Sequence, residues 1–127
     1  MNMQIVRIAD AGVPNKERIH ISVIRETTLS FFIVMKTTKG PMTLESHVGR
    51  EGVSSGSQPS FWFPTIQVKA GDQVVLYTSG GTDSAKKTQA GPTNHFIHWG
   101  VGETLFNGPS DCVVLFEIAN WDTTYQQ

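Results

Sequence analysis

Cysteine is almost missing from this chain, whose single thiol is Cys112. One cysteine cannot form an internal disulfide, and it cannot supply a zinc cage built from several thiolates. A lone free thiol suits a reducing compartment, because disulfide-rich scaffolds belong to oxidising ones. The chain must therefore be held together by packing, and 127 residues are enough to bury a core within one domain.

An excess of basic residues is also missing. The sequence has 10 Lys and Arg against 11 Asp and Glu, which gives a formal net charge of −1. Proteins that bind nucleic acid by neutralising phosphates usually carry a clear basic excess. The overall charge therefore disfavours that role, although it leaves room for a local basic face.

Long apolar runs are absent too. The longest, Phe31–Met35, is far shorter than the roughly 20 residues that cross a bilayer as a helix. The first residues, MNMQIVRIAD, lack a positively charged region followed by an apolar stretch, so we see no signal peptide. These features predict a cytoplasmic protein without a membrane partner, provided that the sequence is not cut from a longer one.

A sustained helical period is not found either, and alternation with a period of two dominates. Ile19, Ile21 and Val23 alternate with His20 and Ser22, as in a half-buried strand. Similar segments with Gly, Pro and Asn between them predict an all-β fold, a β-sandwich or a barrel, of about seven to nine mostly antiparallel strands. We expect one domain over 1–127, with its core at about 5–121. The expected strands lie within 3–10, 18–24, 29–38, 61–64, 66–78, 95–99 and 111–118.

Two connections in this pattern are long. They cover Lys39–Ser60 and Ser79–Asn94, and both are rich in Gly and Ser. Loops longer than about 12–15 residues are either functional or disordered. The conformation of these two loops is therefore left open at this point.

The order of short motifs resembles the lamin-tail domain family, in particular its short stand-alone bacterial-type members. The resemblance covers roughly Ile5–Trp121, and Pro109 departs from the usual residues before Asp111. It implies an immunoglobulin-like sandwich without conserved catalytic residues. It also implies an interaction module, since in animal lamins such domains bind partner proteins, with DNA as a second candidate ligand. The residues that carry the resemblance are Asn15–Ile19, Phe63, Pro64, Val68, Gly71, Asp72, Val74, Leu76, Tyr77, Trp99, Gly100, Gly102, Leu105–Asn107 and Asp111–Leu115.

The most suggestive chemical feature is the pair His95 and His98. Three residues apart on a helix, two histidines share a face and can chelate zinc. In a strand they point to opposite faces, so a shared metal site would need a non-strand segment or help from His47 or Asp83. A metal-dependent hydrolase around these histidines is therefore the least favoured function, and we expect no metal.

Aromatic residues and the thiol have structural interpretations of their own. We expect Trp99 to pack in the core, whereas Trp62 is equally compatible with a ligand platform, because one residue of Phe61–Phe63 must point away from the others. Cys112 shares a strand face with Val114 and Phe116, which predicts a buried and inert thiol. The side chains of Asp72 and Asp111 are expected to bond backbone amides of turns.

Lysines at the two long connections are the candidate contacts to a partner or to nucleic acid. Lys86 and Lys87 belong to one connection, and Lys36 and Lys39 lie at the start of the other. If these loops met at one end of the sandwich, the lysines would contact phosphates and Trp62 would stack on a base.

A nucleotide cofactor has no support, because the glycine-rich segment Thr78–Thr82 lacks the GK[ST] ending of a P-loop. We therefore expect no cofactor and no catalytic residues. The favoured function is a non-enzymatic module that binds a protein or itself. The alternative is weak binding of nucleic acid through Lys86, Lys87, Lys39 and Trp62.

Overall fold

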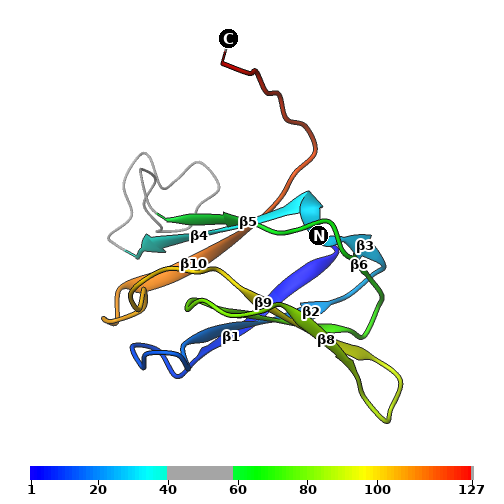
Figure 1. Cartoon of the computed structure of the whole chain (residues 1–127), viewed down its shortest axis with the longest axis horizontal. Coiled ribbons are helices and arrows are strands. Elements are labelled where there is room, and N and C mark those ends of the chain that lie inside the picture. Colours follow the sequence, from blue (N-terminus) through cyan, green and yellow to red (C-terminus); the bar gives the residue numbers. More distant parts are fainter. Residues whose placement is uncertain (40–58, 127) are drawn as a thin grey trace.

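The protein is described by a computed structural model that covers residues 1–39 and 59–126. Strands form two facing layers, and one short 3₁₀ helix precedes β4 (Figure 1). The elements are β1 (Met3–Ala9), β2 (Arg18–Val23), β3 (Thr27–Thr28), η1 (Leu29–Phe31), β4 (Phe32–Thr38), β5 (Ser60–Trp62), β6 (Gln67–Val68), β7 (Gln73–Tyr77), β8 (Ser84–Lys87), β9 (Thr93–His98) and β10 (Asp111–Glu117).

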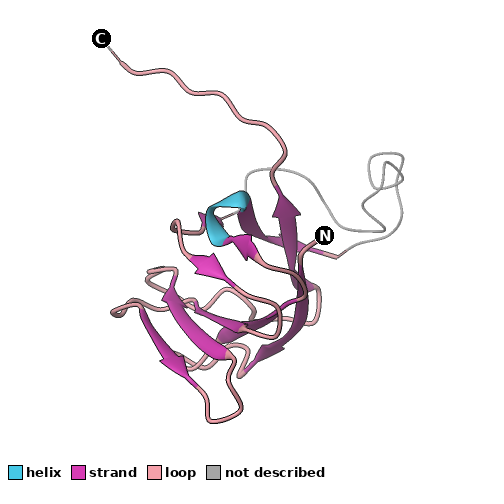
Figure 2. Ribbon diagram, turned by 90° about the vertical axis from the view of Figure 1, so that its right-hand side faces the viewer, coloured by secondary structure: helices cyan, strands magenta, loops and turns pink. Residues whose placement is uncertain are grey.

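The larger layer is a five-stranded sheet with the order β1-β2-β7-β9-β8. Neighbouring strands in this sheet are antiparallel, except that β7 and β9 run parallel. The smaller layer has the order β10-β4-β5, and β3 and β6 form a two-stranded sheet at one end (Figures 1 and 2). The expected all-β sandwich of mostly antiparallel strands is therefore confirmed.

Alternating apolar residues place the core between the layers. In β2 the buried positions are Ile19, Ile21 and Val23, while His20 and Ser22 point outward, as the pattern predicts. Burial of apolar surface contributes about 25 cal/mol per Å², so these side chains are the main source of stability. The buried cluster consists of Met3, Ile19, Ile21, Val23, Leu29, Phe32, Val34, Phe63, Val68, Val74, Leu76, Ile97, Leu105, Phe106 and Leu115.

The segment expected to be a loop over Ser79–Asn94 contains a strand, which corrects that prediction. β8 pairs with β9 so that Lys86 lies opposite Asn94 and Ser84 opposite Phe96. All four residues of β8 are exposed, so the strand is held by backbone pairing at the sheet edge and leaves no hydrophobic pattern. The other long connection, Lys39–Ser60, lies mostly outside the described residues.

The last strand was expected to bury the face that carries Cys112, Val114 and Phe116, and this is wrong. Leu115 is the buried residue of β10 and Val113 packs against the core, whereas Phe116 is 43% exposed. Both alternating sets of this strand are apolar, so periodicity alone does not identify the inner one. Cys112 is consequently half-buried and not fully buried.

Candidate functional site

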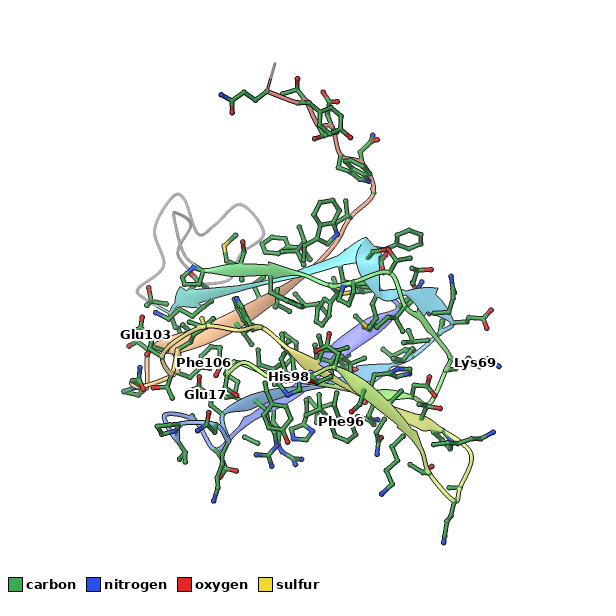
Figure 3. The ribbon with its side chains drawn as sticks, in the orientation of Figure 1. Glu17, Lys69, Phe96, His98, Glu103 and Phe106 are labelled. Atoms are coloured by element: carbon green, nitrogen blue, oxygen red, sulfur yellow. The ribbon has the colours of Figure 1, made fainter. Side chains whose placement is uncertain are left out.

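The two histidines of β9 point to opposite faces of the sheet, as the strand pattern predicts. His95 is buried, and its Nε2 lies 3.1 Å from Oδ2 of Asp72. His98 points outward, where its Nδ1 lies 3.1 Å from Oδ1 of Asp83 (Figure 3). Within residues 1–39 and 59–126, no three His, Cys, Asp or Glu side chains are grouped as a metal would need. His47, the other residue considered for this site, lies outside the described residues.

Asp72 stabilises the turn before β7, which confirms its predicted role. Its carboxylate accepts hydrogen bonds from the backbone amides of Lys69 and Thr93, at 3.0 and 2.9 Å. Burial raises the pKa of Asp72, but the two amides and His95 outweigh this effect and hold the pKa below its usual value. Gly71 provides the turn with a positive φ of 93°.

Glu17 is a buried acidic group whose role the sequence patterns did not reveal. Its side chain is 1% exposed, and its carboxylate accepts four hydrogen bonds of 2.7–3.0 Å (Figure 3). The donors are the amides of Gly12, Leu105 and Phe106 and the hydroxyl of Thr78. One carboxylate thus connects three segments that are far apart in sequence. The sign of this role in the sequence was the position of an acidic residue directly before β2, whose alternate residues are buried.

A shallow pocket lies beside the Glu17 contacts. Its volume is about 140 Å³, smaller than the roughly 300 Å³ at which small-molecule sites begin. Thr78 lines it and also donates to Glu17, so its wall belongs to the same network. The lining residues are Pro14, Asn15, Thr78, Ser79, Val101, Gly102, Glu103 and Thr104.

The outer surface of the three-stranded sheet, here called the apolar face, is the candidate interaction surface. Because directly paired residues share a face, Phe116, Ile33 and Trp62 form one row across β10, β4 and β5, and Val114 and Met35 belong to the next. Trp62 is 50% exposed and Phe116 43%. The five side chains are uncharged, so this surface offers apolar contact without charge.

Trp62 is held in a defined orientation on the apolar face. Its indole Nε1 donates a hydrogen bond of 2.7 Å to the carbonyl of Ser30. Trp121, from the segment after β10, packs edge-on against it with ring centroids 5.6 Å apart. Trp62 is thus the outward residue of Phe61–Phe63. The predicted core role of Trp99 is supported, since its half-buried ring packs against the core 5.9 Å from that of Phe61.

Cys112 also lies on the outer side of β10. Burial is the main cause that raises the pKa of this thiol, and the neighbouring Asp111 adds to the effect. Lys36 and Lys39 act in the opposite direction without cancelling it. A raised pKa leaves less thiolate at neutral pH, which fits a weakly reactive cysteine.

The structure places the four predicted contact residues in two groups. Lys86 and Lys87 lie on β8 at the edge of the larger sheet, whereas Lys39 follows β4 and Trp62 ends β5 in the smaller one. Lys36 forms an ion pair of 3.2 Å with Asp111. The four residues therefore do not make one common patch.

Comparison with known proteins adds no relative. No protein-family model matches the chain, and no curated protein matches it either. The resemblance to lamin-tail domains stays a prediction. No helix in the described part of the chain is long and apolar enough to cross a membrane.

Proposed function

We propose that the protein is a non-enzymatic interaction module that binds a protein surface, in the first place a second copy of itself, through the apolar face. The observation that carries this proposal is an uncharged sheet surface with two large aromatic side chains, Trp62 and Phe116, about half exposed. Contiguous exposed apolar patches of this kind mark sites of protein association. We also propose that the module acts in the cytoplasm.

Self-association fits the chemistry of this surface. A two-fold interface brings the same residues together from both copies, so a charged face would repel itself, whereas an uncharged one does not. Two sheets also pack readily face to face, with their side chains interdigitating in a layer about 10 Å thick. Trp62 is already fixed by its bond to Ser30, so little side-chain entropy is lost when it is covered.

The non-enzymatic part of the proposal is supported by the roles of the buried and half-buried acidic groups. Glu17 connects loops, and Asp72 is occupied by a turn and by His95. Asp111 accepts amide hydrogen bonds from Asn107 and Gly108. Groups engaged in this way stabilise the framework and are poorly placed to transfer protons to a substrate.

We also propose membership of the lamin-tail family as the origin of this module. Several residues of the resemblance have clear structural duties here. Glu17 holds three segments, Asp72 a turn, and Asn107 bonds both the backbone and the hydroxyl of Thr104. Such roles support the resemblance, because residues that maintain a fold are those that a family of diverse binders would share.

Sedimentation velocity over a concentration series tests self-association. The informative variant is Phe116→Lys, which places a charge on the apolar face directly beside Ile33. We expect the unmodified protein to dimerise as concentration rises, and the variant to dimerise at least about tenfold more weakly, as for an interface hot spot. The matched control is Val6→Lys, since Val6 is 52% exposed on β1 of the other sheet.

Circular dichroism of both variants checks that the fold is kept. A monomer at all concentrations, or an equal loss of association in Val6→Lys and Phe116→Lys, would contradict the proposal. If the protein is a monomer and another protein binds in a manner that Phe116→Lys abolishes, the face is right and the second copy is wrong.

A further inference from the structure

The outer surface of the five-stranded sheet, here called the cationic face, is on the opposite side of the sandwich from the apolar face (Figures 1 and 3). In the part of the chain that the structure describes, its outward strand positions include Lys, Arg and His but no Asp or Glu. The segregation is notable in a chain whose acids outnumber its bases. These positions are Gln4, Arg7, Ala9, Arg18, His20, Ser22, Gln73, Val75, Tyr77, Ser84, Lys86, Asn94, Phe96 and His98.

Positive groups gather at the β1–β2 end of this face. Arg7 lies opposite His20 in register, and Nε of Arg18 donates to Nε2 of His20 at 3.2 Å. Burial, followed by the charges of Arg7 and Arg18, lowers the pKa of His20 and so favours the neutral imidazole that accepts the bond from Arg18. Among the described residues, the side chain of the exposed Arg7 has no hydrogen-bond or ion-pair partner. A bound anion would compensate the charge of Arg7.

The carboxylates nearest to this face are at its rim and are already paired. Asp10 forms an ion pair of 2.7 Å with Arg18, and Asp83 bonds the ring and the backbone amide of His98. These carboxylates fix the orientation of Arg18 and His98. The positive charges of Arg7 and Lys86 are left without a paired carboxylate.

An apolar strip of two residues, Val75 and Phe96, lies between the two ends of the face. Val75 is 6% exposed and lies between His20 and Phe96 in the same row of the sheet. Phe96 points outward from β9 (Figure 3), and beside this row the ring of Tyr77 stacks on His98 with centroids 5.4 Å apart. From Arg7 on β1 to Ser84 on β8 this row crosses four strand spacings, about 19 Å, which is more than one phosphate group covers.

We propose that the cationic face binds single-stranded nucleic acid, with phosphates on Arg7 and Lys86 and bases on the half-buried ring of Phe96 between them. Spaced cations beside an apolar, aromatic floor are the two elements that sequence-independent binding of a single strand requires. A width of about 19 Å accommodates several nucleotides, in line with sites of about 4–16 nucleotides on other sheet surfaces.

β8 offers a matched pair of lysines for the test. Lys86 shares the outward face with Phe96, since Lys86 pairs with Asn94 and Ser84 with Phe96. Lys87 is the next residue of the same strand, and its side chain points to the opposite side. A binding site on the cationic face must therefore distinguish two neighbouring lysines that are both exposed.

The experiment is fluorescence-anisotropy titration of a labelled oligo-dT of twelve nucleotides at several salt concentrations. We expect Arg7→Ala and Lys86→Ala each to weaken binding roughly three- to tenfold and to reduce the dependence of log K on log salt by about 0.7, as one phosphate contact does. Lys87→Ala should bind as the unmodified protein does. The same holds for Arg25→Ala, since Arg25 lies between β2 and β3, outside the outward strand positions of this face, and its side chain donates to Oδ1 of Asn2. Phe116→Lys should do so too, which separates this inference from the proposed function.

Three outcomes would overturn the inference. The first is no binding of the oligonucleotide at low salt. The second is an equal loss in Lys86→Ala and Lys87→Ala, which would mean diffuse charge attraction. The third is tighter binding to vesicles containing phosphatidylserine or to heparin than to oligo-dT, which would assign the face to another anion. Unchanged thermal unfolding of the variants checks that they are folded.

Discussion

Single acidic side chains hold the turns of this sandwich. Oδ2 of Asp111 accepts hydrogen bonds from the amides of Asn107 and Gly108, both 3.0 Å long. The bond to Lys36 is the main cause that lowers the pKa of Asp111, and the two amides add to it. Asp72 does the same for the turn before β7. Their position before a strand was enough to predict these roles from the sequence.

The pH dependence of stability follows from these carboxylates. Because the pKa of folded Asp72 is below its value of about 3.9 in an unfolded chain, its contribution is complete above that value and is lost as pH falls through the folded pKa. Asp72→Asn should therefore be less stable than the unmodified protein at pH 7, with a gap that narrows in acid. Urea unfolding of both proteins from pH 7 down to about pH 2 measures this gap, and a constant gap would refute the assignment.

At the scale of the elements, the buried carboxylate of Glu17 joins three connecting segments that strand pairing does not hold together. Glu17 receives hydrogen bonds from the β1–β2 connection, from the end of β7 and from the turn before β10. These segments carry no continuous backbone pairing with one another. The arrangement of this end of the sandwich therefore depends on the charge and the two oxygen atoms of Glu17.

Glu17→Gln is the sharpest test of this connection. The amide group would direct N–H donors toward backbone N–H groups, leaving buried donors unsatisfied, so we expect a loss of about 2–4 kcal/mol in the free energy of unfolding. Urea denaturation gives this quantity, and Glu26→Gln, at an exposed position, is the control with the same chemical change. If the free energy of unfolding falls no further than in the control, Glu17 does not hold these segments together.

The elements also show where sequence patterns suffice. β2 was predictable because its faces differ, Ile19 and Ile21 being apolar and His20 polar. β10 was not, because Val113 and Val114 are equally apolar and the choice of inner face is made by the opposing sheet. β8 gave no signal, since an edge strand with four exposed residues is defined by its pairing with β9.

At the scale of the whole molecule, the two layers turn chemically different surfaces to the outside. The smaller sheet presents Ile33, Trp62 and Phe116, and the larger sheet presents Arg7 and Lys86. The fold class and the separation of His95 from His98 were predictable from periodicity. The two faces were not, because each is assembled from strands that are distant in sequence.

Cys112 provides a direct test of the central claim, association through the apolar face. It is on the outer side of β10, and a spin label can be attached to it at alkaline pH, where enough thiolate is present despite the raised pKa. Double electron–electron resonance should then give a distance below about 30 Å between labels of two copies, since packed sheets lie about 10 Å apart. A Cys112→Ser protein with Ser84→Cys, labelled on the opposite side, should give a longer distance. The absence of a dipolar signal from Cys112 in the dimer, or a shorter distance from the Ser84 position, would contradict the account.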